Sequence, residues 1–293
     1  MKNLSIGGVG ISTVVESLRV PMSFAEFLPQ LAAAPEVLEA TRSWLEPRFA
    51  DLAQGVGFLD FHTYVVRTPQ HTILVDTCIG DDKERGGHKF FHKLRTPWLR
   101  NLKAAGVAPE QVDFVLCTHM HADHVGWNTR LVDGRWVPTF PRARYLFART
   151  EYEHRRRNWE AAAGAGYGAF DDSILPVVES GQAVIVEDGH ELDGCLRLEP
   201  APGHTPGNVV IHLQSRGERG VFAGDVLHHP IQVAYPEWSS IFCEDRAQSA
   251  RTRQQFVRTH ADTGTLVIPA HFPAPTVGRI RSQGDRWRYD FVD

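Results

Sequence analysis

The apolar residues of this chain follow two different spacings along its length. Between residues 23 and 50, Phe24, Phe27 and Leu31 recur at helical spacing, and Pro35 begins a second helical segment. The pattern predicts a helical excursion before the first hairpin. Three interpretations stay open for it: packing alone, the cover of a pocket, or a contact between two copies of the chain.

Strand-like patterns lie on both sides of this excursion. An opening strand with a bend is expected over 4–16, and β-branched runs at 57–67 and 71–76 predict a hairpin that turns at 68–70. A short apolar run at 112–117 predicts a buried strand.

The rest of the chain alternates short strands with helices. Further strands are expected near 129–137, 143–147, 182–187, 195–199, 207–214, 219–224 and, as the last one, 266–268, with helices over 98–103, 150–160, 172–179 and 244–260. Many connections are as short as hairpins, which favours two sheets flanked by helices over a single parallel sheet.

The composition is that of an ordinary globular protein. The chain has 293 residues, of which 42% are hydrophobic and 23% charged, and its formal net charge is −4. The densest basic run is His154-Arg155-Arg156-Arg157. A solvated helix face explains this run better than a nucleic-acid patch does, so no nucleic-acid partner is expected.

Segments that would address the chain to a membrane or to the outside of the cell are not expected. The first residues lack the apolar core of a secretory signal, and no run approaches the roughly 18 apolar residues of a membrane helix. Cys78, Cys117, Cys195 and Cys243 are scattered, which is typical of free thiols in a reducing compartment. We therefore predict a cytoplasmic protein with no membrane partner.

The most informative stretch directly follows the buried run at 112–117. It reads THMHADHVGW, and it places His119, His121, Asp123 and His124 within six residues. A strand that ends in such a cluster brings these side chains into one small volume. Imidazole nitrogens and carboxylate oxygens suit zinc and related divalent metals. We interpret the stretch as a metal site rather than as a surface histidine cluster.

Asp76 closes the strand expected at 71–76 and is followed by a turn that ends at Gly80. An acid in this position can orient a ligand histidine through the ring nitrogen that does not bind the metal. It can equally cap the turn. The local sequence favours neither role.

Three more donors stand in the same setting as the cluster. His204, Asp225 and His271 each follow a predicted strand and lie next to glycine or proline. They are far apart in the chain, so only a folded sheet can bring them together. With the cluster they supply seven donors, enough for two metal ions that share a carboxylate.

In this order the candidate residues resemble the metal-binding positions of the metallo-β-lactamase superfamily. The matching positions are Asp76, the His119-x-His121-x-Asp123-His124 motif, His204, Asp225 and His271. The resemblance covers residues 58–275 and implies an α/β fold: an αββα sandwich of two mixed sheets flanked by helices, with the site at one edge. We expect one such domain over 1–293, with the helical excursion at 23–50.

The resemblance also implies how two divalent metal ions are held. His119, His121 and His204 would bind the first ion, while Asp123, His124 and His271 would bind the second. Asp225 would bridge them. Zinc is the expected metal, with iron, manganese or cobalt as alternatives.

This ligand set favours catalysis over a structural metal site. Two cations that share a water lower its pKa to roughly 7 or below, so hydroxide is available to attack a carbonyl or phosphorus centre. Asp123 is the candidate catalytic residue, because it can pass a proton to the leaving group. A structural zinc site usually has four closed ligands, fewer than the seven present here.

Within the superfamily the chain is most similar to the N-acyl-homoserine lactonase and methyl parathion hydrolase branch. The similarity lies in residues 75–83, 118–126, 202–207 and 224–229. Trp127 stands where thioester hydrolases of the glyoxalase II type usually have glycine. The branch implies a hydrolase that opens a lactone or cleaves a related ester, with phosphotriesterase side activity.

Two other functions stay open. The same site would serve a thioester or aryl-ester hydrolase. A protein of a different class, a non-catalytic metal-binding or sensor protein, would lose stability or partner binding on His119→Ala, with no turnover to lose.

Candidate substrate contacts are less well defined than the metal site. His228, His229 and Trp127 are the candidates close to metal-binding positions, and Tyr167 and Tyr235 are candidates for assisting the leaving group. Some of the aromatic residues can also line an apolar pocket, although core packing explains most of them: Phe24, Phe27, Phe90, Phe91, Trp98, Trp127 and Trp238. The partner we predict is a small ester or lactone.

Overall fold

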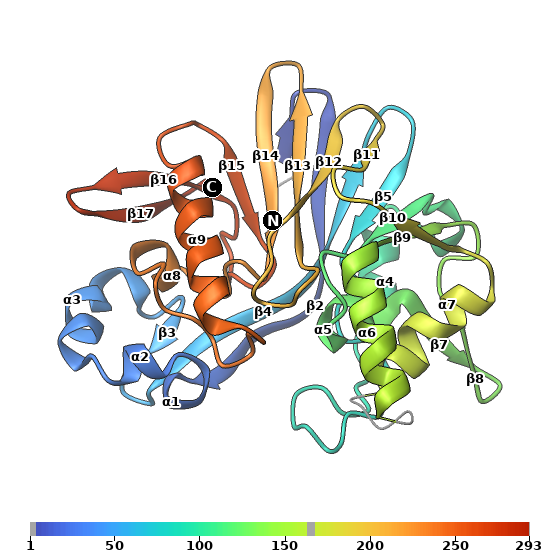
Figure 1. The fold of residues 1–293 in the computed structure, drawn as a ribbon, viewed down its shortest axis with the longest axis horizontal. Helices are drawn as coiled ribbons and strands as arrows, with labels where there is room; N and C mark the ends of the chain where they lie inside the picture. Colours follow the sequence, from blue (N-terminus) through green and yellow to red (C-terminus); the bar gives the residue numbers. More distant parts are fainter. Residues whose placement is uncertain (1–3, 163–167, 293) are drawn as a thin grey trace.

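Two β-sheets lie face to face in the computed structural model, which describes residues 4–162 and 168–292 (Figure 1). The first sheet contains the strands expected in the first half of the chain. Its order is β1 (Leu4–Ile6), β2 (Val9–Ser23), β4 (Val56–Arg67), β5 (Thr72–Val75), β6 (Phe114–Leu116), β9 (Arg144–Ala148) and β10 (Ala183–Val186), with β3 (Ala50–Asp51) beside β4. The strand expected over 4–16 is therefore a hairpin, and its second strand continues to Ser23.

The second sheet follows the order of the chain. It consists of β11 (Glu191–Leu192), β12 (Leu196–Pro200), β13 (Val209–Ser215), β14 (Glu218–Gly224), β15 (Leu266–Pro269), β16 (Gly278–Gln283) and β17 (Arg286–Phe291). The expectation that the strand at 266–268 is the last one was wrong, because β16 and β17 pair beyond it. Arginines alternate along both strands, so their hydrophobicity is too low to reveal them.

Helices cover the outer faces of both sheets (Figure 1). On one side lie α1 (Phe24–Phe27), α2 (Pro29–Ala32), α3 (Pro35–Leu45), α8 (Ile231–Ala234) and α9 (Arg246–His260). On the other lie α4 (Trp98–Ala104), α6 (Arg149–Ala161) and α7 (Leu175–Glu179), with the hairpin of β7 (Thr129–Val132) and β8 (Arg135–Pro138). Short turns complete the set: α5 (Ala122–Val125), the 3₁₀ turns Pro109–Gln111 and Gly126–Asn128, and the π-helical turn Phe170–Ile174, which replaces the start of the helix expected over 172–179.

The alternation of side chains along the strands divides the core into layers. On β5, Ile73 and Val75 lie in the cluster between the two sheets, whereas Leu74 lies in the cluster beneath α4. On β13, Ile211 faces the inter-sheet cluster and Val210 the cluster that contains residues of α9. This alternation confirms the predicted fold class, a sandwich of two sheets with helices outside each.

Within the excursion expected at 23–50, the helices α1, α2 and α3 occupy the part from Phe24 to Leu45, while Ser23 ends β2 and Ala50 begins β3. Phe24, Phe27 and Leu31 are buried with Leu45 in one cluster, which also takes in Ile231 of α8. The excursion therefore packs on its own chain. A contact with a second copy stays a prediction.

The direction of the strands brings several of their ends to one edge. β5 and β6 run parallel in the first sheet. In the second sheet β12 and β14 both run antiparallel to β13, so they share a direction, and β15 is parallel to β14. The turns that follow these strands consequently meet at one edge, which is where the predicted donors lie.

Two further sequence expectations concern membranes and cysteines. Within residues 4–162 and 168–292, no helix has the length and apolar character needed to cross a bilayer. Cys78, Cys117, Cys195 and Cys243 are all free thiols.

Tyr64 links the two sheets close to the candidate site. Its hydroxyl donates a 2.6 Å hydrogen bond to the carbonyl oxygen of Pro269 at the end of β15. We expect Tyr64→Phe to lower the free energy of unfolding by about 1–3 kcal/mol, because the buried carbonyl loses its partner. Urea unfolding followed by circular dichroism measures this. Tyr152→Phe is the control, since no other described residue bonds its hydroxyl, and equal stabilities of the two variants would contradict the prediction.

Candidate metal centre and active site

The structure brings all seven predicted donors to the edge where the strand ends meet. His119 and His121 lie in the turn after β6, and Asp123 and His124 follow in α5. The other three donors, His204, Asp225 and His271, lie in the turns after β12, β14 and β15.

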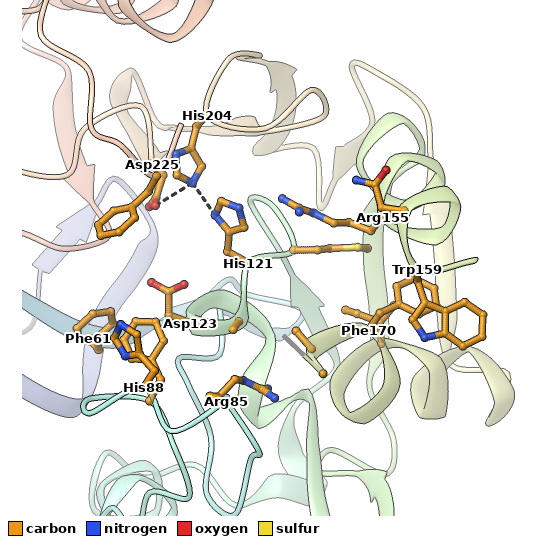
Figure 2. A pocket seen from close by; sticks show the side chains of 18 of the residues that line it. Phe61, Arg85, His88, His121, Asp123, Arg155, Trp159, Phe170, His204 and Asp225 are labelled. Atoms are coloured by element: carbon orange, nitrogen blue, oxygen red, sulfur yellow. Dashed lines mark hydrogen bonds and ion pairs between the residues drawn. The ribbon is translucent and has the colours of Figure 1, made fainter. Parts of the chain in front are cut away.

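The first group of donors is a triangle of ring nitrogens. His119 Nε2 lies 3.0 Å from His121 Nδ1, and His204 Nε2 lies 3.1 Å and 2.8 Å from these two atoms. Figure 2 shows His121 and His204 turned toward each other and toward Asp225. Three nitrogens that face one common point cannot all be satisfied by hydrogen bonds among themselves.

The second group is formed by Asp123, His124 and His271. His271 Nε2 lies 3.2 Å from His124 Nε2, and Asp123 Oδ2 lies 3.6 Å from each of these nitrogens. Each group has one partly exposed member at the cavity: His121 in the first group and Asp123 in the second.

Asp225 lies between the two groups. Its Oδ2 is 3.2 Å from His204 Nε2, while its Oδ1 is 3.2 Å from His124 Nε2 and 3.1 Å from His271 Nε2. The two oxygens of one buried carboxylate are therefore directed at different donor groups.

The donors fit divalent metal ions. Nitrogen ligands at about 2.0–2.1 Å from a tetrahedral zinc lie roughly 3.3 Å apart, close to the separations in both groups. Asp225 Oδ1 is buried without a hydrogen-bond partner, although such oxygens are normally paired. His119, His121, His204 and Asp225 form one candidate ligand set, and Asp123, His124 and His271 form another.

Other side chains and carbonyls orient the histidines. Asp76 Oδ2 lies 2.9 Å from His124 Nδ1, so this ring directs Nε2 at the second group. Asp76 thus makes the contact expected of an orienting acid, and it also accepts hydrogen bonds from the backbone and hydroxyl of Thr118. The carbonyl of Asp60 lies 3.1 Å from His271 Nδ1 and orients that ring similarly.

Burial and charge divide the histidines by protonation. Burial lowers the pKa of His119, His121 and His204 well below the usual value, so these rings are neutral and can donate lone pairs. Burial also opposes the charged form of His124, but the carboxylates of Asp225, Asp123 and Asp76 together outweigh it and raise the pKa of this ring.

A cavity of about 590 Å³ opens onto the donors. In Figure 2, Phe61 and His88 lie on one side of Asp123, while Arg155, Trp159 and Phe170 lie on the other. The apolar walls of the cavity include Met22, Leu59, Phe61, Phe91, Met120, Trp159, Phe170 and Ile174. A small molecule with an apolar group can lie against these walls with its polar end at the donors.

The three candidate substrate contacts lie in different places. His228 lines the cavity, and its Nε2 is 3.2 Å from Asp225 Oδ2. His229 instead faces the helical excursion, where its Nε2 lies 2.9 Å from the carbonyl oxygen of Phe49. Trp127 is buried, stacked on Trp98 at 5.0 Å. Of the three candidates only His228 lines the cavity, so the structure supports a substrate contact for His228 and offers none for His229 or Trp127.

Few of the candidate tyrosines and predicted aromatic residues line the cavity. Tyr235 is stacked on Trp238 and does not line the cavity, and Tyr167 lies outside the described residues. Of the predicted aromatic set only Phe91 lines the cavity, and most of the others belong to hydrophobic clusters.

Sequence reasoning missed the contribution of α6. Arg155, Asn158 and Trp159 line the cavity from one side of this helix. The basic run was interpreted as a solvated face, which holds for Arg156 and Arg157, whereas the side chain of Arg155 is only 19% exposed. The spacing of three and four residues, which places these side chains on one face, was the available signal.

Residues 57–271 match the family described as the metallo-beta-lactamase superfamily. The chain belongs to this superfamily. The predicted family is thereby confirmed, and the match includes every predicted metal-binding position.

Curated relatives of this superfamily member are N-acyl homoserine lactonases. One from Azorhizobium caulinodans is 30% identical over 60% of this chain and 64% of its own length. One from Agrobacterium fabrum is 27% identical over 59% of this chain and 62% of its own length. The matched region thus spans less than two thirds of either relative. These relatives confirm the resemblance to the lactonase branch.

Solved structures match almost the whole chain. The hydrolase AbOPH of the beta lactamase superfamily has a TM-score of 0.80 and 26% identity, covering 99% of this chain and 97% of that one. AidC, described as a dizinc quorum-quenching lactonase, has a TM-score of 0.76 and 20% identity, covering 100% of this chain and 97% of that one. This match shows that the two proteins share a fold.

Removal of metal should destabilise the folded chain. We expect chelation to lower the melting temperature and added zinc to restore it, since an ion that binds only the folded state stabilises it by about 4 kcal/mol at 1,000 times its Kd. Differential scanning calorimetry after dialysis against a chelator checks this. His119→Ala should blunt the response, and a melting temperature unaffected by chelator would contradict the prediction.

Proposed function

We propose that this chain is a metal-dependent hydrolase that opens a lactone ring. The observation that carries the proposal is the placement of Asp225 between two groups of ligand-capable side chains at the floor of an apolar cavity. The names of the curated relatives and of the solved structures support the substrate class.

The proposed centre holds two divalent ions. His119, His121 and His204 would hold the first, Asp123, His124 and His271 would hold the second, and the carboxylate of Asp225 would serve both. The ions supply Lewis acidity and a hydroxide available near neutral pH. We expect zinc, because AidC is a dizinc lactonase, while a nitrogen and oxygen donor set also accommodates iron, manganese or cobalt.

In the proposed reaction, hydroxide adds to the ring carbonyl carbon and the bond from that carbon to the ring oxygen breaks. The ring oxygen leaves as an alkoxide and takes up a proton, which gives a hydroxy acid. Asp123 is suited to carry this proton, because its carboxylate lines the cavity beside the donors. His228 also lines this cavity, so its imidazole is a candidate for donating to a substrate oxygen.

We assign the binding of the apolar part of the substrate to the cavity walls. Phe61 and Phe91 on one side, and Trp159 and Phe170 on the other, hold an apolar substituent and exclude water. A phosphotriester can be attacked at the same place by the same hydroxide, so we include phosphotriesterase as a side activity.

The panel that tests the function compares a lactone, a thioester, an aryl ester and a phosphotriester. We expect the largest kcat/KM on the lactone, abolition by chelation, and two equivalents of zinc or a similar metal in the active protein. A single equivalent in active protein would rule out the two-ion centre. Greater activity on the thioester or aryl ester would favour those hydrolases, and metal binding without any turnover would favour a sensor.

The substitution Asp225→Asn tests whether the carboxylate of Asp225 is shared by the two proposed ions. We expect kcat/KM to fall by more than about 100-fold, because loss of a bridging charge should exceed the roughly 10–100-fold effect of removing an outer partner. Steady-state kinetics with metal analysis of the same sample measures it. The matched control is Asp171→Asn, a carboxylate that lines the cavity but belongs to neither donor group. Equal activity of the two variants would contradict the assignment.

The apolar walls predict a dependence on acyl length. We expect kcat/KM for N-acyl lactones to rise with each added methylene while the chain still fits, by at most about fourfold per group, since burying one methylene contributes roughly 0.8 kcal/mol. Kinetics on a series from short to long acyl chains measures the slope. Trp159→Ala should flatten it, and a flat series for the unchanged protein would show that the walls do not hold the acyl group.

A further inference from the structure

Glu151 is a buried carboxylate that lies outside both donor groups. It sits in the first turn of α6 and is 1% exposed. A buried carboxylate is stable only when its oxygens are paired. The partners of Glu151 therefore indicate what it does.

One oxygen of Glu151 holds the turn that carries the first two histidines. The backbone N–H of Met120, between His119 and His121, donates to Oε1 at 2.9 Å. This bond ties the turn after β6 in the first sheet to the start of α6.

The other oxygen holds the turn of His204. The hydroxyl of Thr205 donates to Oε2 at 2.6 Å, and the N–H of Gly207 donates to the same oxygen at 3.3 Å. The approach is close, because a Cβ at Gly207 would lie 2.1 Å from the backbone nitrogen of Glu151. The turn after β12 in the second sheet is thereby tied to the same carboxylate.

A cation balances the charge of Glu151 without interrupting these bonds. Arg155 Nε donates to Oε1 at 3.0 Å, and Arg155 Nη2 lies 3.0 Å from Glu244 Oε1. The N–H of Glu244 in turn donates to the carbonyl oxygen of His204 at 2.9 Å. This second link to the His204 turn is made through the backbone of Glu244, so a change in its side chain leaves the link in place.

We propose that Glu151 is a positioning residue for one metal ion of the pair: it sets the separation of the turns that carry His119, His121 and His204. The inference rests on the two-ion centre of the proposed function. The second group has its own supports, since Asp76 contacts His124 and the carbonyl of Asp60 contacts His271. Loss of the Glu151 carboxylate should consequently weaken one site and spare the other.

The test is Glu151→Gln in the full chain, titrated with zinc against a competing chelator. Glutamine keeps the size of the side chain but replaces one acceptor oxygen with a donor, so the backbone N–H of either Met120 or Gly207 loses its acceptor. The Thr205 hydroxyl can turn to accept from the amide. We expect the affinity of the His119, His121 and His204 site to fall by about 10–100-fold, the range for outer partners of metal ligands. The other site should be unchanged, and anomalous scattering from crystals grown at limiting zinc locates the ion that remains.

Three further variants make the result specific. Glu244→Gln removes the outer ion pair but keeps every bond to Glu151, so both affinities should be unchanged. Thr205→Val removes one donor and should weaken the same site less than Glu151→Gln does, which keeps the proposal testable if the glutamine variant fails to fold. Asp76→Asn is the reciprocal change and should weaken the site of Asp123, His124 and His271 more strongly.

Two outcomes would overturn the proposal. One is an equal loss of affinity at both sites in Glu151→Gln. The other is unchanged affinity with only a lower melting temperature, which is the result of a purely structural role. Failure of the proposed function would be seen differently. If the protein without substitutions binds two ions but hydrolyses no lactone, the proposed function fails while the proposal for Glu151 still stands.

Discussion

Buried polar atoms crowd around Asp225, and this crowding constrains how the two sheets meet at the site. Ring nitrogens of His124, His204, His228 and His271 all lie 3.1–3.2 Å from its two oxygens. So many desolvated groups are stable together only if cations or mutual charge compensate them. The arrangement therefore requires turns from both sheets to meet at one edge, and the sandwich provides this because the contributing strands end there.

Two buried carboxylates outside the donor groups maintain that meeting point. Asp76 bonds to the histidine of α5 and to Thr118, while Glu151 bonds to the turns of both sheets that carry the first group. Asp76 directly follows β5, whereas Glu151 lies in α6, and the two carboxylates have different hydrogen-bond partners. Side chains that hydrogen bonds already hold in place lose less conformational entropy when they bind a ligand or ion. This is the physical advantage of buried carboxylates that hold the donor turns.

Sequence reasoning succeeded where a residue type and its strand-end setting coincide. The histidines and Asp225 were expected to lie together for this reason, and the structure brings them together, whereas their binding of metal stays a prediction. The family was predicted from the resemblance of the ordered set and is confirmed. It failed for β16 and β17, whose alternating arginines hide the strand pattern, and for Arg155, which shares a basic run with exposed neighbours. His229 and Trp127 follow metal-binding positions closely, yet their side chains point into the core.

The order of residue types along the chain is enough to specify the available chemistry: nitrogen and oxygen donors at the ends of strands, and a hydrophobic pattern that pairs two sheets. Tertiary structure alone decided which side chains face the cavity. A change of one position turns a side chain from one face of a strand or turn to another, as the neighbours His228 and His229 illustrate. The partners of Glu151 could not be foreseen either, because bonds from one carboxylate to two distant turns depend on how α6 packs against both sheets.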